Sequence, residues 1–171
     1  MVFYAIIFLN VLIYLLEFLF GKSVFINNFA LYYGSDFYTF FTYSFLHGDF
    51  EHIFMNMVML FMLSQILRFL NIKHLLIVYF VGAIISSLGY YYLMINMGYY
   101  NFILLGASGA ISALMGYAAI ILRQNGFLIA IVVTSIISAV IFQNIAWQAH
   151  IFGAIFGIIY AYGIYFFKEI E

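Results

Sequence analysis

One serine in this chain is set among small residues, which leaves its hydroxyl open to close approach. Ser108 follows Gly106 and Ala107 and precedes Gly109, at the start of an otherwise apolar segment. A serine hydroxyl is a weak nucleophile and needs a neighbouring base to take its proton. The imidazole of His150 is the best candidate for that base, so we expect a nucleophilic pair of serine and histidine.

Small residues recur after both members of this pair. They are Gly153, Gly157 and Ala161 after the histidine, and Gly109, Ala113 and Gly116 after the serine. Small residues at this spacing allow two membrane helices to pack with their backbones close. Such packing would bring Ser108 and His150 within hydrogen-bond reach. The alternative is that both stripes serve packing alone and that Ser108 bonds a backbone carbonyl.

A polar segment from His47 to Asn56 supplies the donors that acyl transfer needs. Such a reaction requires hydrogen-bond donors aimed at the developing oxyanion. His52 and Asn56 are four residues apart and therefore share a helical face, and the amide of Ser108 at a helix start is another donor. Polar side chains are costly inside a bilayer, which favours a functional role. For Asn56 alone, interhelical hydrogen bonding is an equal alternative.

The acidic residues lie away from the serine and the histidine. Asp36, Asp49 and Glu51 belong to the first connection or its end, and Glu169 and Glu171 to the C-terminal tail. Because none is placed to orient His150, the sequence favours a dyad over a triad. Glu17 lies near the end of the first apolar segment, where we expect it to reach the membrane interface.

The composition is that of an integral membrane protein. Of 171 residues, 68% are hydrophobic and 6% are charged, whereas soluble domains carry about 25% charged residues. Since roughly 20 apolar residues span a bilayer, the length fits a single domain, residues 1–171, of about six helices. A net charge of −1 without a basic run argues against a nucleic-acid partner. The absence of cysteine excludes disulfides and sulfur-ligated metals.

Six apolar segments account for most of the chain. They are Val2–Phe20, His52–Leu70, Leu75–Met97, Ser108–Leu122, Phe127–Phe142 and Ala149–Phe167. The first has no basic region before it and no cleavage signature after it, so we expect a retained span and not a signal peptide. The long connection from Gly21 to Glu51, rich in Phe and Tyr, is expected to fold against the interface.

The basic residues predict the orientation in the membrane. Arg68, Lys73, Arg123 and Lys168 fall on one side and Lys22 on the other. This asymmetry favours both termini in the cytoplasm. The second, fourth and sixth helices then all begin on the outer side, and their first turns carry the candidate site residues.

Depth follows from helix length. Ser108 is roughly 22 Å of helix away from Arg123 at about 1.5 Å per residue, short of a hydrocarbon core of about 30 Å. Ser108 should therefore lie below the outer surface. The non-helical backbone before it, residues 101–107, must be covered by protein or line a wet cavity.

Three motifs follow one another along the chain. His47, His52 and Asn56 come first, Gly106-Ala107-Ser108-Gly109 with Ala113 and Gly116 follows, and Ala149-His150 with Gly153 and Gly157 comes last. Together they resemble the motifs of the rhomboid family of intramembrane serine proteases. The likeness covers nearly the whole chain.

The resemblance implies an all-α fold, a compact six-helix membrane bundle that cleaves peptide bonds in or near transmembrane segments of other proteins. It implies Ser108 as nucleophile and His150 as general base and acid. His52, Asn56 and the Ser108 amide would stabilise the oxyanion. The supporting residues would be His47, Gly106, Gly109, Gly153 and Gly157. No metal or other cofactor is expected, and the partners would be transmembrane substrates and lipids. The minimal six-helix form suggests a bacterial plasma membrane.

Two positions depart from the family pattern. The usual Trp-Arg pair of the first loop appears here as Tyr38-Thr39, which bears on the anchoring of that loop. The aromatic residue often found four positions after the nucleophile is Ser112 in this chain. Positioning of the imidazole is therefore left to other contacts.

Access to the site is expected at the fifth connection. The segment from Gln143 to Gln148, with Phe142 and Trp147 at its edges, is predicted to cap the dyad and to move when substrate enters. Substrates should unwind easily at the cleavage point, because a hydrogen-bonded helix hides its carbonyls from the nucleophile.

Two other classes of protein are alternatives. A metal or haem protein would use His47, His52 and His150 as ligands, although the first two fall on different faces of a helix. A channel, transporter or catalytically silent scaffold of rhomboid-like shape would use the polar groups to line a solute path, but no charged residue lies mid-span to couple an ion.

Overall fold

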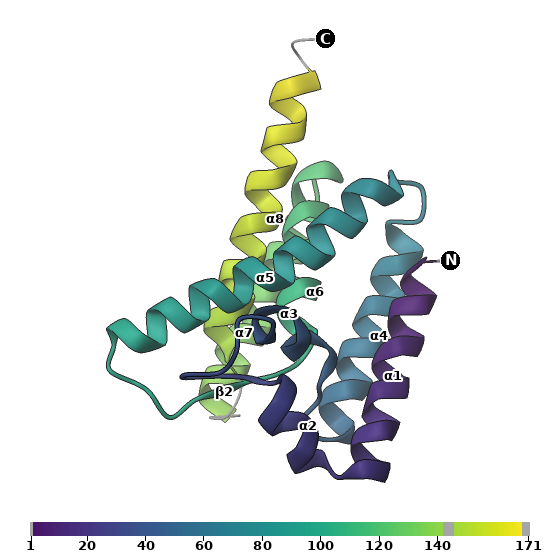
Figure 1. The fold of residues 1–171 in the computed structure, drawn as a ribbon. Coiled ribbons are helices and arrows are strands. Elements are labelled where there is room, and N and C mark those ends of the chain that lie inside the picture. The colour runs from purple at the N-terminus through teal and green to yellow at the C-terminus, as the bar shows by residue number, and fades with distance from the viewer. Residues whose placement is uncertain (1, 142–145, 169–171) are drawn as a thin grey trace.

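Helices make up most of the computed structural model, which describes residues 2–141 and 146–168 (Figure 1). The longer helices are α1 (Val2–Phe20), α4 (Phe50–Ile66), α5 (Ile72–Asn96), α6 (Ser108–Ile121), α7 (Gly126–Ile141) and α8 (Trp147–Lys168). The first connection contains α2 (Lys22–Phe29), α3 (Thr39–Thr42) and the 3₁₀ helix η1 (Tyr43–Phe45). Strands β1 (Leu31–Tyr32) and β2 (Ile103–Leu104) form a small antiparallel sheet. The predicted all-α membrane bundle is confirmed.

The six predicted segments correspond to the six longer helices, and the bounds of α1 coincide with the prediction at both ends. The largest difference lies at α4, which ends at Ile66 and not at Leu70. The chain turns there, and the Leu70 amide donates to the Leu67 carbonyl at 3.0 Å. By length and composition, three of the described helices can cross a bilayer unaided: α1, α5 and the Trp147–Tyr165 part of α8.

The α6 helix lies at the centre of the bundle. Every residue from Gly109 to Ala119 is buried, and the helix contacts α4, α5, α7 and α8. Its 14 residues span only about 21 Å at 1.5 Å per residue. A helix enclosed by other helices does not have to match the thickness of the lipid, which explains how so short a segment serves as the core.

The α6 and α8 helices pack with their backbones in contact. A Cβ added at Gly153 would meet the carbonyl oxygen of Gly109, and one added at Gly157 would meet that of Ala113. In the reverse direction, a Cβ at Gly116 would meet the carbonyl oxygen of Ala154. No side chain fits between the two backbones at these points, so the close approach of the helices requires glycine there.

The first connection folds back against the segment that leads into α6. Strand β1 belongs to this connection and pairs with β2, which precedes α6. The amide of Gly106 then donates to the carbonyl of Tyr43 in η1 at 2.9 Å. The non-helical backbone before Ser108 is thus hydrogen-bonded and covered by protein, as a segment at membrane depth requires.

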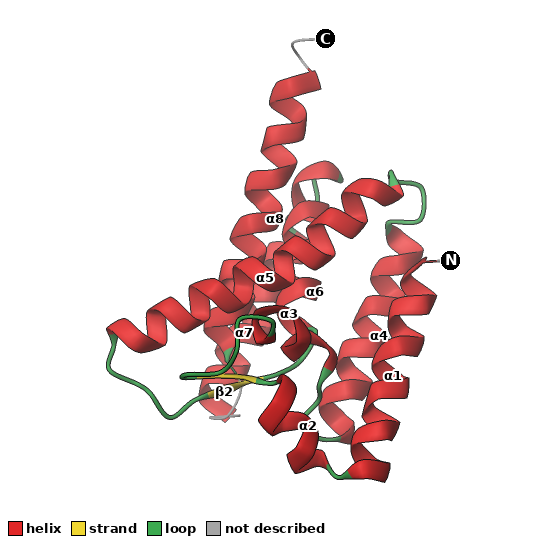
Figure 2. Cartoon of the chain, in the orientation of Figure 1, coloured by secondary structure: helices red, strands yellow, loops and turns green. Residues whose placement is uncertain are grey.

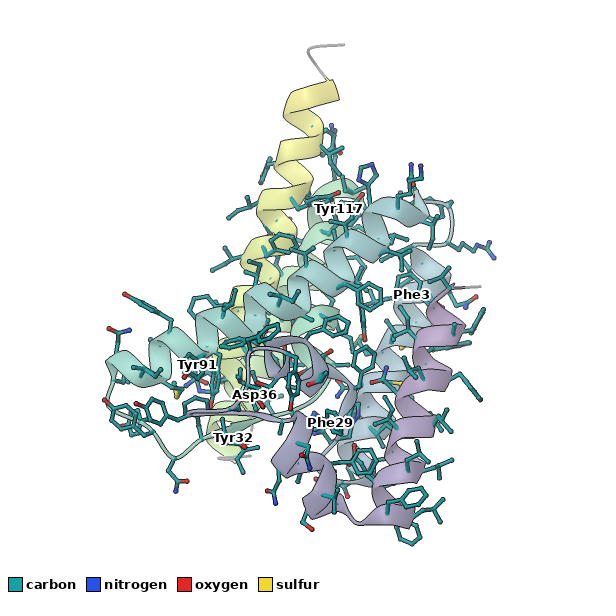
Figure 3. All side chains as sticks on the ribbon, viewed as in Figure 1. Phe3, Phe29, Tyr32, Asp36, Tyr91 and Tyr117 are labelled. Atoms are coloured by element: carbon teal, nitrogen blue, oxygen red, sulfur yellow. The ribbon has the colours of Figure 1, made fainter. Side chains whose placement is uncertain are left out.

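Contacts with α5 anchor the first connection. The hydroxyl of Tyr43 donates to the carbonyl of Ala83 at 2.8 Å. Tyr91 of α5, labelled in Figure 3, packs edge-on against Phe40, with ring centroids 5.1 Å apart. These contacts hold the loop at positions outside the Tyr38-Thr39 pair, where the family pattern differs.

The two ends of the bundle carry different groups. Helices α4, α6 and α8 all begin at one end, as predicted from the parity of the spans (Figure 1). The start of α1, the end of α8 and the turns that follow α4 and α6 lie at the other end (Figure 2). Those turns contain Arg68 and Arg123. The first half of the expected cap from Gln143 to Gln148, residues 143–145, lies outside the described residues.

The backbone contact between α6 and α8 generates a stability prediction. Gly157→Ala places a Cβ against the Ala113 carbonyl and is expected to destabilise the bundle by about 1–3 kcal/mol through overpacking. Gly163, on the same helix, is the matched control, because a Cβ there meets nothing within 4 Å. Thermal unfolding in one detergent compares the two variants, and equal unfolding temperatures would contradict the packing described above.

Candidate active site

Ser108 and His150 are in contact. Ser108 is the first residue of α6, and His150 lies in the first turn of α8. The Nε2 atom of His150 is 2.9 Å from the Oγ atom of Ser108. His150 is buried and the two helices pack closely at their glycines, so the imidazole lies at a distance suited to proton transfer.

Ser86, which the sequence analysis did not single out, bonds the backbone beside His150. The hydroxyl of Ser86 in α5 donates to the carbonyl of Ala149 at 2.7 Å, directly before the histidine. A side chain at Gly109 would collide with Ser86 and lie 3.2 Å from the hydroxyl of Tyr43. Gly109 therefore lets α5 and the first connection approach the start of α6. The two adjacent serines, Ser86 and Ser87, within an apolar segment were the feature of the sequence that could have indicated this role.

His52 and Asn56 of α4 reach the loop that precedes the serine. A Cβ built on Gly106 would lie 2.6 Å from Nε2 of His52 and 3.7 Å from Nδ2 of Asn56. Gly106 also has φ of 113°, a backbone conformation that side chains disfavour. Glycine is required here on both grounds. The close approach brings two side-chain donors beside the backbone just before Ser108.

The start of α6 adds backbone donors. The carbonyl of Ala107 accepts from the amide of Ile111 at 3.0 Å, so the helical hydrogen bonds begin after the first three amides. Amides in a first turn have no acceptor within the helix, and the helix dipole makes this end favourable for negative charge. The Ser108 amide thus borders the same stretch of backbone as His52 and Asn56.

Glu17 lies in the interior, and its predicted position at the interface is wrong. Its side chain is 1% exposed, and its Oε1 atom accepts the amide of His47 at 3.4 Å. The reason is that Glu17 lies on the buried face of α1, seven residues after the buried Asn10. That spacing, which equals two helical turns, was the signal in the sequence.

His47 supports the site from behind His52. Its side chain is fully buried, and its ring packs edge-on against that of His52 with centroids 5.1 Å apart. Burial, and to a smaller extent the neighbouring His52, lower the pKa of His47. The ring is therefore neutral near pH 7 and acts here as a packing surface.

The described residues give no support to a metal centre. No three His, Cys, Asp or Glu side chains among them gather into a set that could hold an ion. The alternative that uses His47, His52 and His150 as ligands requires such a set. His52 and His150 instead approach different parts of the segment around Ser108.

Comparison with known proteins identifies the family. A family model described as the Rhomboid domain matches residues 34–167. No curated protein gives a significant match. The matched range extends from the first connection into α8 and includes the candidate site residues in α4, α6 and α8. The chain belongs to the rhomboid family.

Proposed function

We propose that this protein is an intramembrane serine protease that cleaves peptide bonds in or near the transmembrane segments of other membrane proteins. The contact of 2.9 Å between Nε2 of His150 and Oγ of Ser108 carries the proposal. It is supported by membership of a family whose members are typically intramembrane serine proteases.

In the acylation step, the neutral imidazole of His150 takes the proton of Ser108 at Nε2 while Oγ attacks the carbonyl carbon of the scissile bond. The carbonyl electrons move to oxygen and form a tetrahedral oxyanion. The imidazolium then gives its proton to the leaving amine as the carbon–nitrogen bond breaks. An ester remains on Ser108, and one peptide product is free to leave.

Deacylation repeats the sequence with water. His150 takes a proton from the attacking water, and the second tetrahedral oxyanion collapses as the proton passes to Oγ of Ser108. In both steps we assign the oxyanion to donors from His52, Asn56 and the Ser108 amide, which border one stretch of backbone. Preorganised donors of this kind are worth more in a site that excludes bulk water.

The supporting residues have steric roles in this proposal. Gly106 admits His52 beside the loop, and Gly109, Gly153 and Gly157 allow the close approach of α6 to its neighbours. His47 packs behind the ring of His52. Each glycine therefore acts by leaving space that a donor, a backbone or the dyad requires.

The proposal includes the substrates and the location of the protein. Substrates are transmembrane proteins whose helix unwinds at the cleavage point, because only then is a carbonyl open to Ser108. We place the protein in the bacterial plasma membrane with both termini in the cytoplasm. The turns that follow α4 and α6 carry arginines, Arg68 and Arg123, which favour the cytoplasmic side.

The dyad is tested by removing its two members. Ser108→Ala and His150→Ala are each expected to lower cleavage of a single-span substrate in liposomes by at least about 10³-fold, and to abolish labelling by a fluorophosphonate. Ser112→Ala is the matched control, because this serine is buried on the same helix one turn later. Retained cleavage in Ser108→Ala would refute the proposal.

The donors are tested on α4. His52→Ala and Asn56→Ala are each expected to lower kcat by about 10²–10³-fold with a small change in KM, because the oxyanion forms only along the reaction. Ser64→Ala is the control, since Ser64 is a buried polar residue of the same helix whose hydrogen bonds are with the Phe61 carbonyl and the neighbouring Gln65 side chain, away from the candidate site. Steady-state cleavage gives both constants.

The main competing function is a catalytically silent rhomboid-like scaffold or transporter. It predicts neither cleavage nor fluorophosphonate labelling by the folded wild-type protein. Labelling of the wild type that is lost in both Ser108→Ala and His150→Ala would exclude it.

A further inference from the structure

The buried side chain of Glu17 contacts the turn that leads into α4, the helix that carries His52 and Asn56. Glu17 of α1 is 1% exposed, and its Oε1 atom accepts the amide of His47 at 3.4 Å. Its other oxygen, Oε2, is buried without a hydrogen-bond partner among the described residues. Removing an acid from water and bonding it to one backbone amide is costly. Such a residue inside a membrane protein calls for a role beyond packing.

The same turn sets the hydrogen bonding of His52. The amide of Gly48, the residue after His47, donates to Nδ1 of His52 at 3.4 Å. Asp49 then caps the helix, and its Oδ1 atom accepts the amide of His52 at 2.7 Å. A ring nitrogen that accepts an N–H bond holds a lone pair and no proton. Neutral His52 therefore carries its proton on Nε2.

The protonated nitrogen is the one that faces the site. Nε2 of His52 lies 2.6 Å from the position that a Cβ of Gly106 would occupy, beside the loop that leads to Ser108. In the opposite tautomer, Nε2 would present a lone pair to a developing negative charge, which is repulsive. The orientation of the Gly48 amide thus decides whether His52 is a donor at all.

We propose that Glu17 is a positioning residue for His52: its carboxyl oxygen holds the His47–Gly48 turn so that the Gly48 amide bonds Nδ1 and leaves Nε2–H as the donor. This inference rests on the proposed protease function. Glu17 acts through the turn and does not touch the reacting atoms.

The surroundings of the turn support this assignment. Both ring nitrogens of His47 are buried and lack hydrogen-bond partners among the described residues. The turn is therefore not held by a bond from this ring. Its ring packs edge-on against His52 and limits the motion of that imidazole. The bond from Glu17 comes from a different helix, α1, and ties the His47 backbone to it.

A double-mutant cycle tests the coupling through activity. Glu17→Leu is expected to lower kcat by about 10–100-fold, a part of the effect of losing one oxyanion donor. In the His52→Ala background, Glu17→Leu should cause almost no further loss, because the residue that it positions is gone. In the Asn56→Ala background its effect should remain at full size. Equal losses in both backgrounds would show a general structural effect and overturn the proposal.

Two variants of α1 serve as controls. Glu17→Gln keeps an oxygen acceptor for the His47 amide and should retain nearly full kcat. Asn10→Leu removes a buried polar side chain from the same face of α1, where it bonds the carbonyl of Ile6, and should leave the kcat of the folded protein unchanged. A large loss of kcat in Glu17→Gln would contradict a role as acceptor.

A spectroscopic measurement keeps the two proposals separate and requires no Glu17→Leu variant. In Ser108→Ala protein labelled with ¹⁵N-histidine, the His52 signals, assigned by their loss in His52→Ala, should show an unprotonated Nδ1 and a protonated Nε2 at neutral pH. A protonated Nδ1 overturns the positioning role, whether or not the wild type is a protease. If the wild type gives no cleavage that depends on Ser108, the proposed function fails first.

Discussion

The structure depends on the contact between the backbones of α6 and α8. Gly153 and Gly157 have no side chains that would keep the two helices apart. In lipid, where burying apolar surface gives little drive for helices to associate, close packing of this kind supplies much of the attraction. It also fixes the relative register of the helices. Ser108 and His150 stand at the starts of these helices, so the packing that holds the bundle together also sets the distance between hydroxyl and imidazole.

Polar groups at the site are arranged so that neighbouring elements support one another. Ser86 bonds the carbonyl before His150, and Tyr43 bonds both α5 and, through its own carbonyl, the amide of Gly106. In a medium of low dielectric, each hydrogen bond is strong and each unpaired polar atom is expensive. The first connection is therefore part of the site, because it supplies partners for backbone that would otherwise lie unbonded within the membrane.

The side chains of the candidate site come from two helices, α4 and α8, which contact α6 in different ways. The α8 helix brings the proposed base, His150, by backbone packing, whereas α4 brings the proposed donors over a glycine in a left-handed conformation, Gly106. Ser108 sits at the junction of both contacts. Variants of α4 and variants of α8 therefore test different parts of the proposed function.

Sequence patterns within single segments were sufficient to predict much of the fold. The helices were predicted from apolar length, and the pairing of α6 with α8 from the spacing of their glycines, because both depend on residues near one another in the chain. The structure inside the first connection was not predicted. Strand β1 and η1 are short, and they exist because β2 and α5 provide hydrogen-bond partners from distant parts of the chain.

The amino-acid sequence by itself determined the class of protein, the helices and the residue types available for chemistry, since these follow from composition and local periodicity. Only the tertiary structure decided which of the described acidic residues lies inside the bundle. The sequence placed Glu17 at the interface, because an acid near a helix end usually reaches water. The packing of α1 instead turned it inward onto the His47 amide, and the direction of a side chain is set by the neighbours of its helix.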